Sequence, residues 1–240
     1  MEVELKVSIK KNLRYFDLDV SFVCPDEEML VLIGPSGGGK TTIVRIIAGL
    51  EKADGGEVSY HGETWLDVKN GIDIPPQKRR LGYVFQEYTL FPHLNVFDNV
   101  AFSAHGKKEV ERYLKLFGIW HLQKRKPSEI SGGERQRCAI CQALARHPRI
   151  LLLDEPFSAL DVPTRRRLRD EVKALKESLS IPIIYVTHDI SEALFLADDI
   201  LPVVEGKVSD DWLQQTITGA ASTEAGRSKA VREPRLSLVY

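Results

Sequence analysis

The sequence predicts an α/β protein in which a parallel core sheet is joined to an N-terminal antiparallel β subdomain and carries a mainly helical insertion. Apolar and polar residues alternate strictly over 16–22, which is the period of a strand with one face in solvent. Short continuous apolar runs, typical of parallel strands covered on both faces, occur at 29–33, 81–85, 150–153 and 183–186. Helical patterns separate these runs, and that alternation is typical of an α/β domain.

Helical and hairpin patterns account for most of the remaining residues. Helices are expected at 41–48, at several places between 95 and 147, at 164–179 and at 191–197. Residues 200–204 and 207–208, joined by Glu205 and Gly206, predict a closing hairpin. Because 87–146 contains no strand-like run, we expect a helical subdomain there, within one domain of residues 1–215. Residues 216–240 lack periodicity and predict a loosely ordered tail, with no regulatory domain.

The charge balance selects no partner by itself. Lys and Arg number 33 and Asp and Glu number 34, so the net charge is -1 and no overall field favours nucleic acid or an anionic membrane. The N-terminus has no apolar signal core, and no apolar run is long enough to cross a bilayer. We therefore expect a cytoplasmic protein that binds no nucleic acid.

The cysteine content agrees with a reducing compartment. Cys24, Cys138 and Cys141 are too few, and odd in number, for a disulfide scaffold. Cys138 and Cys141 lie three residues apart in a predicted helix, where small apolar packing residues are a better interpretation than a redox pair or half of a metal site.

The most informative segment is the glycine-rich stretch 34–41, which reads GPSGGGKT and lies between a predicted strand and a predicted helix. Glycines let backbone amides converge on phosphate oxygens at a helix N-terminus. Lys40 adds a positive charge, and the hydroxyl of Thr41 can ligate magnesium. The segment therefore predicts binding of a nucleoside triphosphate.

Two further motifs extend this chemistry. An apolar strand ends in Asp154 and Glu155, at the strand edge where ligands bind in doubly wound sheets. Asp154 is suited to hold magnesium and Glu155 to accept a proton from an attacking water. Ser131, Gly132 and Gly133 begin another predicted helix, whose free amides and dipole form a second anion site. Because one chain contains two predicted anion-binding elements, one of them is expected to bind the phosphate held by a different molecule.

Together these segments resemble the ATP-binding subunit of ABC transporters. The family motifs match residues 34–41 (Walker A), Gln86 (Q-loop), 131–134 (signature), 150–155 (Walker B), 158–161 (D-loop) and His188 (switch histidine). The resemblance covers about residues 1–210 and implies a P-loop NTPase core of the RecA-like kind. It also implies ATP hydrolysis with magnesium, coupled to membrane transport.

The resemblance assigns roles residue by residue. Glu155, His188, Gln86 and Lys40 are the implied catalytic residues. Magnesium would be held by Thr41, Gln86 and Asp154. The residues expected to contact nucleotide are Gly34, Pro35, Ser36, Gly37, Gly38, Gly39, Lys40, Thr41, Thr42, Ser131, Gly132, Gly133, Glu134 and Asp161.

Two positions depart from the family pattern. Most relatives have an aromatic ring upstream of Walker A that stacks on adenine, and Lys10 and Lys11 hold that place here. Tyr15, on the polar side of its predicted strand, is the expected substitute. Glu134 replaces the usual glutamine of the signature, and its charge is expected to weaken closure around phosphate modestly.

The resemblance further implies a head-to-tail homodimer with each ATP between Walker A of one copy and the 131–134 loop of the other. Integral membrane permease subunits and, indirectly, a periplasmic or extracellular solute-binding protein would complete the assembly, with this chain peripheral on the inner face of the cell membrane. Tyr88, Leu90 and Phe91 either form the docking surface for the permease or pack within the insertion.

The segment 71–96 is similar to that of oxyanion importers, most closely the molybdate or tungstate type. The alternatives are an importer for another solute, such as sulfate, a polyamine or a sugar, and an exporter or lipoprotein-release system. A gene for an oxyanion-binding protein beside this one would favour the importer. A DNA-repair ATPase would need coiled-coil heptads in the insertion, which the sequence lacks.

Overall fold

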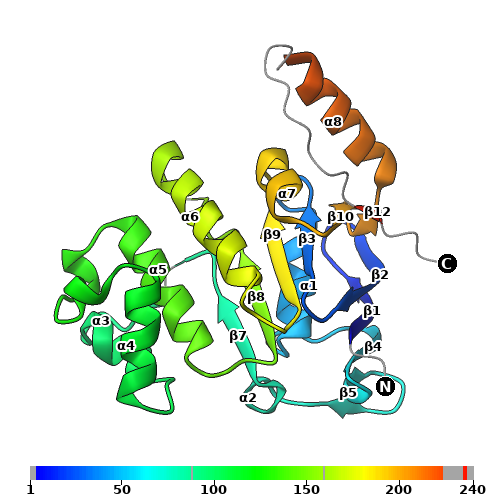
Figure 1. The fold of residues 1–240 in the computed structure, drawn as a ribbon. Coiled ribbons are helices and arrows are strands. Elements are labelled where there is room, and N and C mark those ends of the chain that lie inside the picture. Colours follow the sequence, from blue (N-terminus) through cyan, green and yellow to red (C-terminus); the bar gives the residue numbers. More distant parts are fainter. Residues whose placement is uncertain (1–3, 88, 159, 224–234, 237–240) are drawn as a thin grey trace. The chain divides into compact units, whose positions relative to one another are not determined.

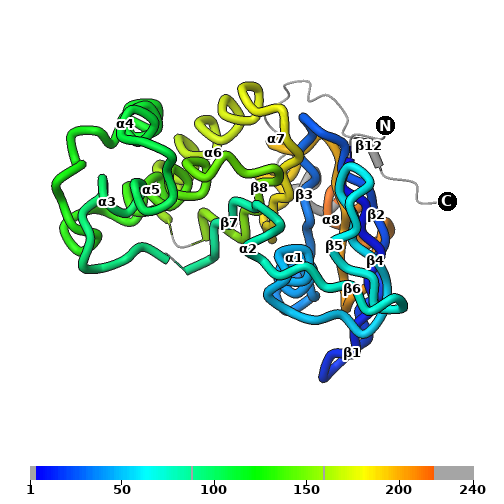
Figure 2. The backbone as a smooth tube through the Cα atoms, turned by 90° about the horizontal axis from the view of Figure 1, so that it is seen from below, coloured from blue at the N-terminus to red at the C-terminus, as the bar shows by residue number. Residues whose placement is uncertain are grey.

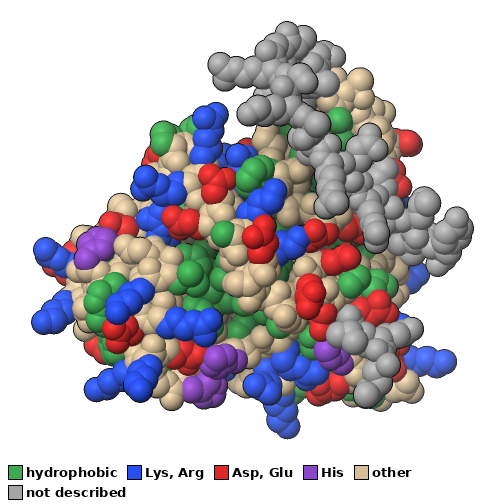
Figure 3. Space-filling view, viewed as in Figure 1, with side chains coloured by type: hydrophobic (Ala, Val, Ile, Leu, Met, Phe, Trp, Pro, Cys, Tyr) green, Lys and Arg blue, Asp and Glu red, His purple; other side chains and the backbone are tan. Residues whose placement is uncertain are grey.

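The computed structural model describes residues 4–87, 89–158, 160–223 and 235–236. The chain divides into two units, one made of 1–79 with 182–240 and the other of 80–181 (Figures 1 and 2). This division differs from the expected helical subdomain at 87–146, because two strands and a further helix group with the insertion. Both basic and acidic side chains occur on the face drawn in Figure 3.

The first unit contains an antiparallel sheet. Its strands are β1 (Glu4–Asn12), β2 (Asp17–Pro25), β4 (Gly55–Tyr60), β5 (Glu63–Asp67) and β6 (Ile72–Asp73), in the order β2-β1-β4-β5-β6. Burial alternates along β1 and β2, so that Leu18, Val20 and Phe22 lie inside while the residues between them face outward. The alternation over 16–22 thus predicted this strand correctly.

The same unit contains parallel strands. Strand β3 (Met29–Ile33) lies between β9 (Ile183–Thr187) and β10 (Asp199–Val204) and pairs with both in parallel. Every residue of β3 and β9 is buried, as expected of strands covered on both faces. Strand β10 also pairs with β11 (Lys207–Val208) in the predicted hairpin, and with β12 (Arg235–Leu236) in parallel.

The helices in the described part of this unit are α1 (Lys40–Ile47), α2 (Pro76–Arg79), α7 (Ile190–Leu196) and α8 (Asp210–Thr223). Helix α8 corrects one expectation, because it includes residues 216–223, which the sequence assigned to an aperiodic tail. The hydroxyls of Thr216 and Thr218 donate to the carbonyls of Trp212 and Gln214, four residues back, so both hydroxyls find acceptors within the helix. Residues 224–234 and 237–240 of the expected tail lie outside the described residues.

The second unit contains two parallel strands, β7 (Leu81–Val84) and β8 (Ile150–Asp154). Its helices are α3 (Val96–Ala101), α4 (Lys107–Leu116), α5 (Gly132–Leu144) and α6 (Val162–Lys176), with 3₁₀ turns η1 (Trp120–Leu122) and η2 (Pro127–Glu129). Over the described part of 87–146 the only regular elements are α3, α4, α5 and the two 3₁₀ turns, as predicted.

Cys138 and Cys141 lie on α5 and are buried. Burial raises the pKa of Cys138 to about 12 and raises the pKa of Cys141 as well. Their sulfur atoms lie against the carbonyls of Val96 and Tyr113, at 3.8 and 3.5 Å. Both are therefore inert packing residues, as the sequence predicted. None of the helices in the described ranges is long and apolar enough to span a membrane.

Candidate functional site

The segment 34–41 forms a loop that leaves the buried end of β3 and enters α1. At Gly34 the backbone has φ of 154°, and a Cβ there would lie 2.0 Å from the carbonyl oxygen of Val203, so only glycine fits. The amide of Gly206 donates to the carbonyl of Gly38 at 3.0 Å, which ties the loop to the β10–β11 hairpin. Pro35, Ser36 and Gly37 are exposed at the tip.

The start of α1 is suited to bind an anion. Its N-cap, Gly39, is left-handed and has no side chain to accept from the first amides, and the first turn contains no acidic residue. The ammonium of Lys40, which is only 4% exposed, donates to the carbonyls of Gly34 and Pro35, both at 2.8 Å. These bonds hold the positively charged side chain of Lys40 against the loop. The exposed Thr41 adds a hydroxyl oxygen that suits a hard cation.

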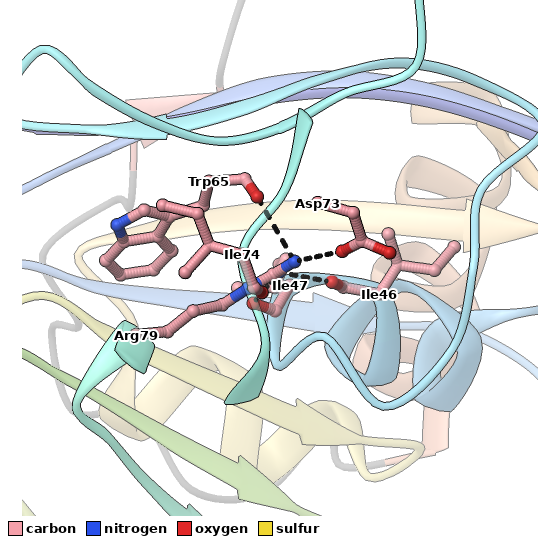
Figure 4. Close-up of polar contacts among 6 residues, drawn as sticks. All are labelled: Ile46, Ile47, Trp65, Asp73, Ile74 and Arg79. Carbon is pink, nitrogen blue, oxygen red and sulfur yellow. Dashed lines mark hydrogen bonds and ion pairs between the residues drawn. The ribbon is translucent and has the colours of Figure 1, made fainter. Parts of the chain in front are cut away.

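A buried arginine holds the opposite end of α1 (Figure 4). The guanidinium of Arg79 donates to the carbonyls of Ile46 and Ile47 at 2.8 and 2.7 Å, and its Nε donates to Ile74 at 2.7 Å. Asp73 accepts from the same group at 3.0 Å. Burial lowers the pKa of Arg79, and the Asp73 carboxylate opposes that shift. The last carbonyls of this helix are thus satisfied, since Ile47 accepts from Arg79 and Ile46 accepts both from Arg79 and from the amide of Gly49 at 2.9 Å.

His188 follows β9 directly, and its side chain is exposed. The residues on either side of it are held more firmly, since Thr187 is buried and Asp189 is the N-cap of α7. In the first unit, therefore, the fold presents the loop, Lys40 and His188 at the ends of two neighbouring parallel strands, β3 and β9.

In the second unit the fold brings Gln86, Asp154 and Glu155 together, because β7 and β8 are parallel neighbours and end at the same edge. The amide nitrogen of Gln86 lies 3.5 Å from a carboxylate oxygen of Glu155. The backbone of Glu155 has φ of 44°, an uncommon left-handed conformation for this residue, and its carbonyl accepts from the amide and hydroxyl of Ser158.

Sequence analysis missed one partner of this acidic pair. Asp154 is 2% exposed, and one of its carboxylate oxygens accepts from the hydroxyl of Tyr83 at 3.1 Å. Tyr83 pairs in register with Leu152, two residues before Asp154 on the neighbouring strand. The register of parallel strands, had it been known, would have indicated this contact.

The 131–134 loop is organised as a capping box at the start of α5. The hydroxyl and the backbone amide of Ser131 both donate to one carboxylate oxygen of Glu134, at 2.8 and 2.7 Å. The backbone amide of Ser131 lowers the pKa of Glu134 below its usual range. Within this chain the carboxylate of Glu134, a residue expected to lie near phosphate in a dimer, contacts Ser131. A Cβ at Gly133 would lie 2.6 Å from a methyl group of Thr164, so glycine permits the approach of α6.

Asp161 is the N-cap of α6, and its carboxylate accepts from the amide of Thr164 at 3.0 Å. That bond lowers the pKa of Asp161. The preceding residue of the expected D-loop, Leu160, is buried, and Ala159 lies outside the described residues.

Tyr15 requires a correction. It does not lie on a strand but in a bend between β1 and β2, where the amide of Leu13 donates to the carbonyl of Phe16 at 3.0 Å. Its side chain is 83% exposed, and the guanidinium carbon of Arg14 lies 5.3 Å from the ring centroid. The alternating pattern begins one residue later than the sequence suggested, because the tight turn uses residues 13–16.

The expected docking residues separate into different environments. Leu90 is buried, which favours the packing interpretation for that residue, and Tyr88 lies outside the described residues. Phe91 is half-buried, and its ring centroid lies 4.7 Å from that of Phe102, a residue that is 71% exposed and that sequence analysis missed. Buried Asn99 fixes this turn by exchanging hydrogen bonds with the backbone of Phe91.

Comparison with known proteins agrees with these features. The family model described as "ABC transporter" matches residues 18–158. A molybdenum import ATP-binding protein of Methylococcus capsulatus is 44% identical over 80% of this chain and 55% of its own length. A molybdate/tungstate import ATP-binding protein of Archaeoglobus fulgidus is 39% identical over 95% of both chains. A sulfate/thiosulfate import ATP-binding protein of Bacillus cereus is 45% identical over 78% of this chain and 54% of its own length.

The chain therefore spans about half the length of the bacterial relatives and nearly all of the archaeal one. Among solved structures, a dimeric ATP-binding cassette in a post-hydrolysis state with ADP and phosphate bound is similar, with a TM-score of 0.71 and 30% identity. That match covers 86% of this chain and 96% of the other, and it confirms the predicted fold class.

Proposed function

The chain belongs to the ABC transporter family, and on that premise we propose that it hydrolyses ATP to power the import of a small oxyanion, with molybdate or tungstate as the favoured cargo. The observation that carries this proposal is the phosphate loop. Its uncapped helix N-terminus and the buried ammonium of Lys40 suit a triphosphate.

The residues of the first unit would bind the nucleotide. The amides of 34–39 and the ammonium of Lys40 would neutralise the phosphates, with Thr42 following in the first turn of α1. His188 would donate a hydrogen bond to the γ-phosphate and respond to its loss. The exposed Tyr15 remains the proposed adenine contact.

The residues of the second unit would carry out the proton chemistry. Glu155 would accept a proton from the attacking water, and Gln86, at 3.5 Å from its carboxylate, would orient the same water. Thr41, Gln86 and Asp154 offer the oxygen ligands that suit magnesium, and the ion when bound would neutralise charge on the phosphates. The Tyr83 hydroxyl would hold Asp154 in place for that role.

We propose a head-to-tail homodimer in which Ser131, Gly132, Gly133 and Glu134 of one copy, with Asp161, contact the nucleotide bound by the other. The dimeric state of the similar ADP-bound cassette supports this arrangement. Charge-assisted hydrogen bonds to the γ-phosphate are each worth about 1.5 to 3 kcal/mol, so their loss after hydrolysis would reopen the dimer.

The dimer would act on integral membrane permease subunits, and the chain would then lie at the inner face of the membrane. The pair Phe91 and Phe102 is the proposed docking surface, because it combines a well-fixed turn with an exposed ring. The permease would in turn receive cargo from a periplasmic or extracellular binding protein.

Sulfate is the second candidate cargo, because a sulfate/thiosulfate import protein is about as similar to this chain as the molybdenum ones. The cargo never touches this subunit, so its residues do not discriminate the two. The test is reconstitution with the permease encoded beside it and the matching binding protein, followed by ATPase measurements with molybdate, tungstate, sulfate and a sugar. We expect stimulation by molybdate and tungstate; stimulation by sulfate alone would favour the second candidate, and by a sugar would exclude both.

A further inference from the structure

A buried carboxylate lies behind His188. Glu192, on the first turn of α7, is 5% exposed. One of its oxygens accepts from the hydroxyl of Thr187 at 2.8 Å and from the hydroxyl of Tyr185 at 3.1 Å. Both donors lie on β9, the strand that ends immediately before His188, and Figure 1 shows α7 beside that strand.

The same hydroxyl closes the turn around His188. Thr187 has one hydroxyl proton, which goes to Glu192, so its oxygen is left as an acceptor. That oxygen accepts from the amide of Asp189 at 3.0 Å. Asp189 in turn accepts, through its carboxylate, from the amides of Ser191 and Glu192 at 2.8 and 3.2 Å. The backbone is thus tied on both sides of His188, while its imidazole stays exposed.

A carboxylate suits this position better than an apolar side chain. It accepts two hydroxyl protons through one oxygen, and it lies near the positive end of the α7 dipole, which offsets part of the cost of burying its charge. A glutamine would offer one comparable oxygen without the charge, and its NH₂ group would need acceptors that the two hydroxyls do not supply while they donate.

We propose that Glu192 is a positioning residue for His188, acting through Thr187 and Asp189 to fix the backbone from which the imidazole meets the γ-phosphate. This inference rests on the proposed function. Glu192 makes no contact with nucleotide in this scheme. Its substitution should therefore change the chemical step while leaving ATP binding by the phosphate loop nearly intact.

The test compares single and double variants by steady-state ATPase measurements, with single-turnover assays at excess protein for the slow ones. We expect Glu192→Gln to lower kcat by about 10-fold and to change KM for ATP by less than about 2-fold. In a His188→Ala background, adding Glu192→Gln should cost less than about 2-fold more, because there is no imidazole left to position. Ser191→Ala, at an exposed side chain of the same helix, is the matched control.

Tyr185→Phe provides a milder version of the same cycle, because it removes one hydrogen bond to Glu192 and keeps the ring. It replaces Glu192→Gln if that variant fails to fold by circular dichroism and thermal melting. Multiplicative losses in the double variant would overturn the inference, since Glu192 would then support the fold without acting through His188. A His188→Ala variant with undiminished kcat would instead overturn the role of His188 in the proposed function.

Discussion

Helices α1 and α5 both begin at glycine-rich segments, yet their first turns are satisfied in different ways. The N-cap of α1 is Gly39, which offers no side chain, and the ammonium of the first helical residue, Lys40, donates to the carbonyl of Gly34. The N-cap of α5 is Ser131, whose amide and hydroxyl both donate to the Glu134 carboxylate. One helix end is prepared for an anion from outside, whereas the other already holds an anion of its own.

The difference indicates a division of labour. A preformed site at α1 would bind the triphosphate in a single copy. At α5, a γ-phosphate would compete with Glu134 for the donors of Ser131, so binding there would require the capping carboxylate to turn away. The second contact would thus be weaker than the first, which suits an interface that has to open in every cycle.

The largest expected effect is on ATP turnover, and it tests the proposed dimer in which the start of α1 of one copy and the start of α5 of the other bind the same nucleotide. Glu155→Gln removes the proton acceptor but keeps the side-chain size, so turnover should fall by about 10² to 10⁴-fold while ATP binding persists. An ATP-bound dimer should then accumulate on size-exclusion chromatography. Adding Ser131→Ala should dissociate that dimer, because it removes a hydroxyl at the start of α5 that is proposed to contact the nucleotide.

Glu177→Gln is the control, because this acid is exposed near the end of α6. Hydrolysis at the wild-type rate in Glu155→Gln would remove Glu155 from its proposed role. A dimer that survives Ser131→Ala would show that the start of α5 takes no part in holding nucleotide.

The next largest effect is on stability and concerns Arg79, which binds the C-terminal end of α1. Arg79→Ala would leave the carbonyl of Ile47 without its buried donor and would remove one of the donors to Ile46, so it should lower the free energy of unfolding by about 3 kcal/mol. The stability of Arg79→Lys should lie between those of wild type and Arg79→Ala, because one ammonium group cannot make all the hydrogen bonds of the planar guanidinium. Urea titration followed by circular dichroism measures both, with the exposed Lys78→Ala as control on the same helix. Equal stability of Arg79→Ala and wild type would contradict this account of α1.

Much of the fold could be predicted from the sequence, because its elements depend on local patterns. Strands β3, β8 and β9 are continuous apolar runs that cannot be exposed, and the Glu205–Gly206 turn joins β10 and β11 as expected. The prediction of a loosely ordered tail from residue 216 was wrong for residues 216–223 because it relied on the same local patterns. Residues 216–223 have no apolar period, and they continue a helix that begins at Asp210, which no local pattern in 216–223 indicates.

The candidate site was predictable in composition and less so in contacts. Residues 34–41 and the pair Asp154 and Glu155 follow from strand ends, which the sequence marks clearly. The partners Tyr83 and Glu192 depend on strand register and on helix placement, and no local pattern reveals either. Tyr15 was misplaced because β2 begins only at Asp17, so that Tyr15 lies in the bend before it.

The smallest expected effect is on stability, from substituting Glu134, whose carboxylate accepts from Ser131 at the start of α5. The pKa of Glu134 is lowered from its ordinary 4.5 in the folded chain, so its charged form stabilises the fold above the unfolded pKa, and that contribution is lost as the pH falls through the folded pKa. Glu134→Gln keeps an acceptor without the charge and should cost at most about 1 kcal/mol at pH 7. The difference from wild type, measured by urea titration at several pH values, should shrink as the pH falls below 4.5 and vanish once the pH is below the folded pKa. A difference that persists there would mean that the carboxylate does not cap Ser131 in solution, and the contrast between the two helix ends would lose its basis.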